Sequence, residues 1–312
     1  MTLTAPAPIK TWFGVGGGAD LFAEPTTERE LSALLAEHPD ARILGDGANL
    51  LVDDAGVAEL VVRLRGELAA WQIDERSGVV RVGAGASLPK LIHATVREGL
   101  AGLHTLGGVP ATVGGAVVMN AGGRFGEIAE VVETVRALKR DGTPVELRRD
   151  EIGFDYRTSG LNGLVVTGVD LRLTPEQSTD DLRGTLKEIM AHKKASQPLA
   201  APSCGCVFRN PSLPRDMEGF GVAGDRVSAG LLIDRAGGKG LTPASGAVRV
   251  SEVHANFFET GPDATARDII ELIDRVRELV ARAFGVKLET ELVIWRRTAA
   301  HAGDARSART RP

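Results

Sequence analysis

Clustered glycines constrain the fold of this chain more than any other feature of its sequence. The 312 residues include 38 glycines, and many of these stand in close groups instead of being spread evenly. Because glycine lacks a Cβ, close-spaced glycines mark places where the backbone turns sharply or approaches a ligand. Several groups follow short β-branched runs, which predicts that they lie at the ends of strands. The groups lie at positions 14–18, 45–47, 83–85, 107–108, 114–115, 122–123 and 237–240.

Composition and charge narrow the class of protein. Hydrophobic residues make up 43% and charged residues 25%, as expected for a globular protein with a sizeable core. The net charge of −4 argues against nucleic acid as the main partner, because neutralising phosphates requires a basic surface. No apolar run is long enough for membrane insertion, and Met1–Pro8 shows no secretory signal. We therefore expect a cytoplasmic protein, and we expect it to be a monomer.

Two smaller features bear on disorder and on metals. The arginine-rich segment 296–312 has the composition of a disordered, solvated tail. Cys204 and Cys206 stand too close together for a useful disulfide, and a reducing cytosol would keep both as thiols. A zinc site would need further ligands, and no second Cys/His cluster supplies them. We expect no metal site.

The spacing of apolar residues predicts alternating helices and strands. Thr27 and Glu30 form a capping-box pair ahead of an apolar stripe at helical spacing. Asp141-Gly142 is typical of a hairpin turn. Further strands are predicted at 42–44, 60–64, 79–82, 117–120, 164–173, 206–208 and 254–258, and further helices at 88–96, 180–194, 228–236 and from Thr265 onward.

Two of the glycine loops are candidate phosphate sites. In Gly45–Leu51 the amides after a strand can point together at an anion, and Asn49 adds a side-chain donor, although an ordinary tight turn fits this loop about as well. The second loop, Gly107–Ala116, consists almost entirely of small residues and proline. Such a sequence is costly in backbone entropy unless a ligand must approach closely. Two loops about sixty residues apart fit a long ligand with a pyrophosphate and a flat ring system.

More familiar nucleotide motifs are absent from the sequence. Gly83-Ala84-Gly85 begins like a dinucleotide fingerprint, but Leu88 stands where the third glycine belongs. No Gly-Lys-Ser/Thr triplet occurs, so there is no P-loop. Neither a Rossmann NAD site nor a P-loop nucleotide site is expected.

From about Lys10 to Trp295 the chain resembles the UDP-N-acetylenolpyruvoylglucosamine reductases, in the FAD-binding superfamily typified by vanillyl-alcohol oxidase. The order and spacing of its motifs carry the resemblance: Leu44–Leu51, Gly107–Asn120, Phe154–Arg157 with Ser159, Gln197-Pro198, Ser203–Pro211, Lys239-Gly240, Ser251–Phe257 and Leu288–Glu291. The resemblance implies an α+β fold with a two-part FAD-binding domain of the vanillyl-alcohol-oxidase type and a C-terminal α/β substrate-binding domain. The implied segments are 1–70 and 71–198 for FAD, 199–288 for substrate, 289–295 as a return to the first part, and 296–312 as the tail.

The implied reaction reduces a UDP-sugar enolpyruvyl ether with FAD as cofactor and NADPH as co-substrate, in peptidoglycan precursor synthesis. The resemblance assigns three catalytic residues. Arg157 would hold the substrate carboxylate, where a surface salt bridge is the alternative. Cys206 would donate the proton, where many relatives have serine and a buried apolar role is the alternative. Glu291 would assist the carboxylate, with Glu289 as runner-up.

The resemblance also implies binding residues and shows departures from the family pattern. Asp46 and Ala48 replace the usual glycine and serine, and Thr290 replaces a proline. His254 has a satisfied core histidine as its alternative. The alternative functions are another flavin-dependent oxidoreductase of this fold and a non-catalytic flavin- or nucleotide-sugar-binding protein. The implied FAD residues are Gly45, Asp46, Gly47, Ala48, Asn49, Leu50, Gly108, Val109, Pro110, Thr112, Gly114, Gly115 and Asn120, and the implied substrate residues are Tyr156, Arg209, Asn210, Lys239 and His254.

Overall fold

The computed structural model describes residues 3–175 and 178–297. Its helices are α1 (Glu28–Glu37), α2 (Leu88–Arg97), α3 (Val113–Val118), α4 (Thr179–Ser196), α5 (Ala229–Arg235) and α6 (Ala266–Phe284). Its strands are β1 (Ala19–Ala23), β2 (Arg42–Ile43), β3 (Leu50–Val52), β4 (Val57–Val62), β5 (Trp71–Asp74), β6 (Val79–Gly83), β7 (Leu100–Ala101), β8 (Gly122–Gly123), β9 (Gly126–Glu127), β10 (Val132–Lys139), β11 (Pro144–Arg148), β12 (Leu164–Arg172), β13 (Thr174–Pro175), β14 (Val248–Val250), β15 (Phe258–Thr260) and β16 (Val293–Trp295). Short 3-10 helices lie at Gly66–Ala69, Leu103–Leu106, Ile128–Glu130 and Arg149–Glu151.

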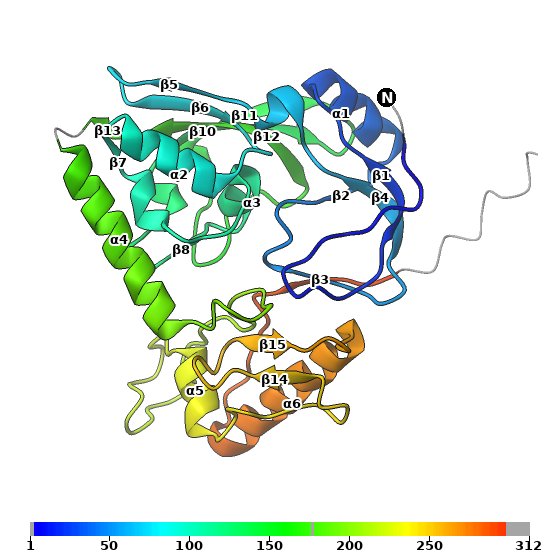
Figure 1. Ribbon diagram of the computed structural model, residues 1–312, viewed down its shortest axis with the longest axis vertical. Coiled ribbons are helices and arrows are strands. Elements are labelled where there is room, and N and C mark those ends of the chain that lie inside the picture. The colour runs from blue at the N-terminus through cyan, green and yellow to red at the C-terminus, as the bar shows by residue number, and fades with distance from the viewer. Residues whose placement is uncertain (1–2, 176–177, 298–312) are drawn as a thin grey trace, which may run out of the picture.

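The N-terminal part is a small parallel sheet in the order β1-β4-β2, with α1 packed beside it (Figure 1). The predicted capping box begins α1, because the Thr27 hydroxyl accepts a hydrogen bond from the Glu30 amide at 3.3 Å. The apolar stripe Leu31, Leu34 and Leu35 is buried. Because that stripe packs into the same core as the sheet that follows, this part and the next share their interior.

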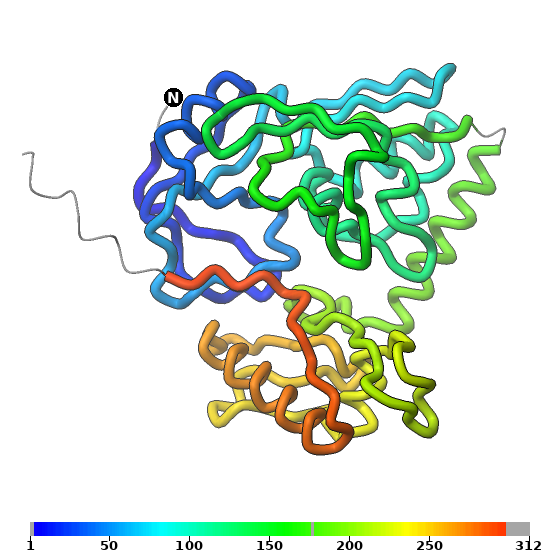
Figure 2. Tube along the Cα trace, turned by 180° about the vertical axis from the view of Figure 1, so that it is seen from behind, coloured from blue at the N-terminus to red at the C-terminus, as the bar shows by residue number. Residues whose placement is uncertain are grey.

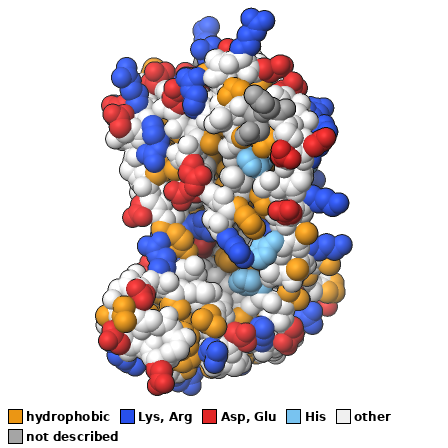
Figure 3. All heavy atoms as spheres, turned by 90° about the vertical axis from the view of Figure 1, so that its left-hand side faces the viewer, with side chains coloured by type: hydrophobic (Ala, Val, Ile, Leu, Met, Phe, Trp, Pro, Cys, Tyr) orange, Lys and Arg blue, Asp and Glu red, His pale blue; other side chains and the backbone are white. Residues whose placement is uncertain are grey.

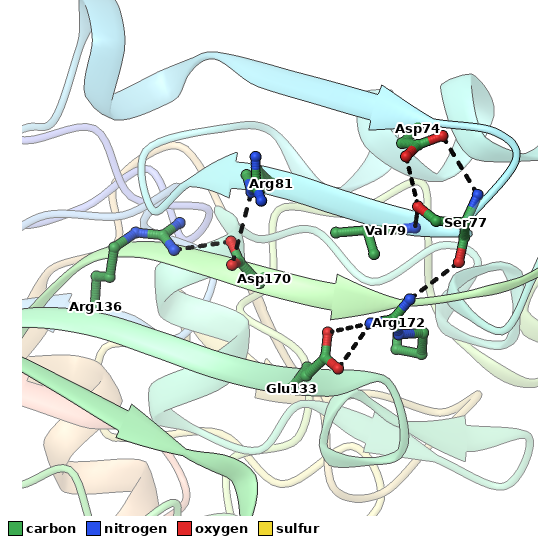
Figure 4. A network of polar contacts seen from close by, with 8 residues as sticks. All are labelled: Asp74, Ser77, Val79, Arg81, Glu133, Arg136, Asp170 and Arg172. Carbon is green, nitrogen blue, oxygen red and sulfur yellow. Dashed lines mark hydrogen bonds and ion pairs between the residues drawn. The ribbon is translucent and has the colours of Figure 1, made fainter.

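The second part is a five-stranded sheet in the order β11-β10-β12-β6-β5, with α2 and α3 packed against it and α4 along its side (Figure 1). The predicted turn at Asp141-Gly142 joins β10 to β11. On the outer face, ion pairs link neighbouring strands, such as Arg136 to Asp170 at 2.8 Å (Figure 4). Val135 and Val169 point the other way and are fully buried. The sheet therefore has one polar face and one face in the core.

The segment after the second glycine loop was predicted as the strand 117–120, and this prediction is wrong. The chain forms helix α3 there instead. The Thr112 hydroxyl accepts a hydrogen bond from the Gly115 amide at 3.2 Å, which satisfies a free donor of the first turn. A methyl group added at Gly114 would lie 2.7 Å from Ala84 Cβ, so the missing side chain lets the helix approach β6. Capping and close packing thus outweigh the strand preference of the two valines.

The C-terminal lobe packs α5 and α6 around the hairpin of β14 and β15 (Figure 1). The predicted helices from Ser228 and Thr265 are confirmed, and both residues cap their helices through their side chains. The predicted strand 206–208 makes only isolated bridges, from Cys206 to Phe257 and from Phe208 to Thr290. Of the predicted strand 254–258, only Phe258 lies in a strand, because the residues before it form a turn.

The chain crosses between the lobes at both ends. After α6 it returns to the N-terminal part, where β16 pairs in parallel with β3 (Figure 2). Phe13 and Leu51, from the N-terminal part, are buried in the core of the C-terminal lobe. Trp295 in turn packs on a small N-terminal core. Each lobe therefore completes the interior of the other.

The start of the predicted tail contacts the folded body. Arg297 Nη2 lies 2.6 Å from Asp20 Oδ2, and the carbonyl of Arg296 accepts a hydrogen bond from Arg42 at 3.2 Å. The remainder of that predicted tail lies outside the described residues. Within 3–175 and 178–297, no helix is long and apolar enough to cross a membrane.

Candidate active site

The two glycine loops meet in space, as a shared ligand would require. A methyl group added at Gly45 would lie 3.0 Å from the Thr112 hydroxyl, so Gly45 allows the loops to approach. Gly47 has a φ of +69°, and a methyl group there would lie 2.3 Å from the Lys10 carbonyl oxygen. That position therefore needs glycine both for its backbone conformation and for space.

The first loop presents a row of free donors. Across the part of the chain that the structure describes, the backbone amides of 45–49 donate to no acceptor. Asp46 is exposed, so its carboxylate need not oppose an anion held by these amides. One N–H of the Asn49 side chain is already used, since Nδ2 donates to the Glu291 carbonyl at 3.1 Å. The loop suits the pyrophosphate of a dinucleotide such as FAD, mainly through backbone N–H groups.

Two non-glycine residues of the described chain have positive φ, and both were predicted site residues. They are Asn120 at 41° and Arg157 at 58°. Asn120 is buried and bridges two segments, donating to the Asp155 carbonyl at 3.0 Å and accepting from the Ala129 amide at 3.3 Å. Arg157 donates from Nη1 to the Gly122 carbonyl at 2.9 Å. Such strain, about 1–3 kcal/mol per residue, persists where neighbouring contacts hold the backbone, typically at functional sites.

All three predicted catalytic residues come together, although they stand far apart in the chain. Arg157 Nε lies 2.8 Å from Glu291 Oε1, with both side chains largely buried. The Glu291 amide donates to the carbonyl of Val207, the residue after Cys206, at 2.8 Å, and the charges of Arg157 and Glu291 act on the Cys206 thiol. The Nε–H of Arg157 is not aligned with any acceptor among the described residues, nor is the Nε–H of Arg209. The Arg157–Glu291 contact is a close ion pair, and the Nε–H of Arg209 is left for another acceptor.

Burial controls the protonation of this cluster. Burial and the neighbouring Glu291 carboxylate raise the pKa of the Cys206 thiol to about 12, against the opposing effects of Arg157 and a hydrogen bond from Asn256. Burial also raises the pKa of Glu291 above its ordinary value, although Arg157 and Arg209 oppose that change. The thiol is consequently protonated at neutral pH.

Tyr156 joins the second part to the C-terminal lobe. Its hydroxyl accepts a hydrogen bond from the Asn210 amide at 3.1 Å. The Asn210 side chain accepts in turn from the Ala229 amide at the start of α5, at 2.9 Å. The Arg226 guanidinium lies 3.9 Å from the centre of the Tyr156 ring. Arg226 was not predicted from the sequence, because a lone exposed arginine carries no local signal of this contact.

Two further predicted substrate residues, His254 and Lys239, lie beside α5. A methyl group at Gly230 would lie 3.1 Å from His254 Cε1, so the imidazole packs against the first turn of that helix. Burial lowers the pKa of His254, and the charge of Lys239 lowers it further. Lys239 also pairs with Asp234 at 3.1 Å. The side chains are thus close to one another, but Lys239 has a protein partner already.

Other residues were either predicted for the site but lie elsewhere, or were not predicted for it. Gly108, an expected FAD residue, packs against α4, where a methyl group would lie 2.8 Å from Met190 Sδ. On that side of the molecule, shown in Figure 3, a groove between α2 and α4 is lined by residues such as Lys90, His93 and Arg97, none of them predicted for the site.

Cys204, which was given no role, is buried with its sulfur 3.5 Å from the Leu50 carbonyl. No cluster that could hold a metal ion occurs within the described ranges.

Comparisons with known proteins agree with this architecture. The family model described as the C-terminal domain of UDP-N-acetylenolpyruvoylglucosamine reductase matches residues 197–295, and a model described as an FAD binding domain matches residues 19–148. The chain is 43% identical over 296 residues to UDP-N-acetylenolpyruvoylglucosamine reductase 2 of Symbiobacterium thermophilum, covering 92% of this chain and 90% of that protein. It is 40% identical over 297 residues to the reductase of Moorella thermoacetica, covering 93% and 91%.

A solved structure agrees as well. The crystal structure of UDP-N-acetylenolpyruvylglucosamine reductase (MurB) from Thermus caldophilus superposes with a TM-score of 0.76 at 39% identity, covering 91% of this chain and 95% of that one. The chain is therefore an α+β protein with an FAD-binding domain and a reductase-type C-terminal domain, as predicted. It belongs to the UDP-N-acetylenolpyruvoylglucosamine reductase (MurB) family.

Proposed function

We propose that this protein reduces UDP-N-acetylglucosamine enolpyruvate to UDP-N-acetylmuramate, with FAD as cofactor and NADPH as reductant, in peptidoglycan precursor synthesis. The observation that supports this most is the meeting of Arg157, Cys206 and Glu291 beside the first glycine loop, where Asn49 bonds to Glu291. We keep the domain division predicted from the sequence as part of the proposal, with FAD in 1–198 and 289–295 and substrate in 199–288.

The FAD site is assigned to the two loops. The free amides of 45–49 would hold the pyrophosphate, with Leu50 closing that loop. Thr112 lies against the first loop at Gly45, Gly114 and Gly115 follow it in the first turn of α3, and Val109 and Pro110 lead into it. When bound, FAD supplies hydride chemistry between NADPH and the enolpyruvyl double bond.

Arg157 and Glu291 would act on the substrate carboxylate. Adding hydride to the enolpyruvyl group places negative charge on that carboxylate, and a fixed cation stabilises it. Arg157 supplies such a cation, and the Nε–H of Arg209, which has no acceptor among the described residues, is a donor for the anion. Because its pKa is raised, Glu291 is easier to protonate than an exposed glutamate, and in that form it can donate to a carboxylate oxygen.

Cys206 would protonate the carbon next to the carboxylate. Its raised pKa keeps the thiol protonated at neutral pH, and the neighbouring Arg157 stabilises the thiolate that forms. Tyr156, Asn210, Lys239 and His254 would hold the UDP-sugar beside α5.

Replacing Cys206 by alanine separates the two halves of the reaction. Flavin reduction by NADPH should continue, because that step does not use the thiol, while flavin reoxidation by the enolpyruvyl sugar should slow by roughly 10²–10⁴, the usual contribution of a positioned acid. Cys206→Ser should retain much more activity than alanine. Stopped-flow absorbance of the flavin measures both steps.

Cys204→Ala is the matched control. Because its sulfur contacts the first glycine loop, we expect weaker FAD binding but an unchanged reoxidation rate once FAD is saturating. Wild-type reoxidation in Cys206→Ala would remove Cys206 from the mechanism. Failure of the enolpyruvyl sugar to reoxidise the reduced wild-type protein would contradict the proposed function itself.

A further inference from the structure

The short segment that carries Cys206 has little support from regular structure. Cys206 and Phe208 make one isolated bridge each, to Phe257 and Thr290, and neither belongs to a continuous strand. The position of a proton donor must nevertheless be fixed within a fraction of an ångström for efficient transfer. Some other contact must therefore fix this segment.

Asn256 makes that contact. Its side-chain oxygen accepts a hydrogen bond from the Phe208 amide at 2.9 Å, and its side-chain nitrogen donates to the Phe208 carbonyl at 2.8 Å. Its own carbonyl accepts from the Val207 amide at 2.8 Å. The side chain is 2% exposed. Three hydrogen bonds from one buried residue thus hold the two residues that follow Cys206.

The orientation of this carboxamide is determined by its partners. The Phe208 amide can only donate and the Phe208 carbonyl can only accept, so the oxygen and nitrogen of Asn256 cannot exchange places. A carboxamide nitrogen has two N–H groups, and one of them is used by Phe208. The carboxamide is therefore fixed in one orientation, with both of its polar atoms on the backbone of Phe208.

We infer that Asn256 is a positioning residue for proton donation by Cys206, because it fixes the backbone beside the thiol. In this step the S–H bond breaks, its electron pair stays on sulfur, and the proton forms the new C–H bond of the substrate. The thiolate regains a proton from solvent after product leaves. The inference depends on the proposed role of Cys206.

Asn256 also connects the thiol to the substrate side of the site. Its backbone amide donates to Nδ1 of His254 at 3.2 Å, and His254 packs on the first turn of α5. A buried carboxamide that serves folding alone should leave proton transfer from Cys206 unchanged when it is altered. One that positions the proton donor should slow that transfer, so the two roles predict different results.

The test compares Asn256→Ala with Ser251→Ala, a fully buried polar residue of the same loop. In Asn256→Ala, flavin reoxidation by the enolpyruvyl sugar should slow roughly 10- to 100-fold, the effect of losing hydrogen bonds at a positioned group. Flavin reduction by NADPH should stay at the wild-type rate. The solvent deuterium isotope effect on reoxidation should increase, because proton transfer becomes more strongly rate-limiting. Ser251→Ala should leave the isotope effect unchanged.

A near-isosteric variant and a chemical probe add independent readouts. Asn256→Asp retains the acceptor for the Phe208 amide but places an oxygen against the Phe208 carbonyl, so it should slow reoxidation at least as much as alanine. Cys206 should also react faster with iodoacetamide in both variants, because the segment that keeps its thiol half-buried is no longer held by Asn256. This measurement needs no substrate. An unchanged alkylation rate would contradict the positioning role.

A double-mutant cycle separates failure of this inference from failure of the proposed function. If Asn256 acts through Cys206, adding Asn256→Ala to Cys206→Ala should slow reoxidation by less than twofold further. If Asn256→Ala slows reoxidation by the same factor in Cys206→Ala as in the wild type, Asn256 has only a structural role and the inference is wrong. If Cys206→Ala alone reoxidises normally, the proposed proton donor is wrong. Asn256→Ser replaces alanine in the cycle if the alanine variant does not fold.

Discussion

At the scale of single residues, the site buries several ionisable side chains. Arg157 and Glu291 compensate one another, since the ion pair offsets part of the cost of burying both. His254 has no such compensation, because the nearest charge that acts on it is the cation Lys239. Its ring is therefore held neutral, with Nδ1 accepting a hydrogen bond from the Asn256 amide.

This environment makes His254 a source of acid sensitivity. Its pKa is lowered in the folded protein, so the unfolded chain binds a proton more readily, and stability is lost as pH falls below the ordinary histidine value of 6.5 toward the folded pKa. His254→Gln should flatten the dependence of melting temperature on pH between 7 and 5. Thermal unfolding at several pH values measures it. His93→Gln, at an exposed position of α2, is the control, and equal flattening in both variants would contradict the prediction.

At the scale of elements, hydrogen bonds at the start of α6 join the two lobes. Thr265 and Asp268 form a capping box there. Asp54, from the N-terminal part, accepts from the amides of Ala266 and Arg267 at 2.7 and 3.1 Å. A carboxylate at the N-terminus of a 19-residue helix also meets the positive end of its dipole. One acidic residue thus caps a helix of the other lobe.

Removing this cap should destabilise the protein measurably. Asp54→Ala leaves two amides of the first turn without their acceptor, and we expect the free energy of unfolding to fall by about 1 kcal/mol. Urea titration followed by circular dichroism measures the change. Asp263→Ala removes an exposed carboxylate close to the same helix end and should have less than half that effect. Equal losses would show that general electrostatics, not capping, is responsible.

The elements also show what the sequence can and cannot predict. Helices with caps and apolar stripes, such as α1 and α6, were predicted correctly because their signals are local. The strand expected at 117–120 is helix α3, because its cap at Thr112 and its packing on Ala84 outweigh local strand preference. The strand expected at 206–208 reduces to single bridges, since its partners come from distant segments.

At the scale of the whole molecule, the site depends on chain crossings that no local pattern reveals. The resemblance to a family supplied Arg157, Cys206 and Glu291 as candidates, but their meeting depends on the return of the chain after α6. Asn256 and Arg226 were missed as contacts of the site, because their partners Phe208 and Tyr156 are distant in sequence. The same crossings that assemble the site also join the two cores.

Because the two lobes share core contacts, we expect them to unfold together, although multidomain chains often unfold in steps. The three tryptophans, Trp12, Trp71 and Trp295, all lie outside the C-terminal lobe, so their fluorescence reports on the FAD-binding part. Leu272 is fully buried in the C-terminal core, where Phe13 and Leu51 also pack. A change at Leu272 should therefore reach the tryptophans through these shared contacts.

Leu272→Ala should lower the free energy of unfolding by about 2–5 kcal/mol, the usual cost of a core cavity. In guanidinium titrations, tryptophan fluorescence and far-UV circular dichroism should shift together to the same lower midpoint. Leu31→Ala, in the core shared by α1 and the five-stranded sheet, tests the same coupling from the FAD-binding part, and both signals should again shift together. If the tryptophan transition stays in place while the circular dichroism transition splits, the C-terminal lobe unfolds independently. The contacts of Phe13 and Leu51 would then be too weak to couple the lobes, and the geometry of Arg157, Cys206 and Glu291 would rest on FAD and substrate binding instead.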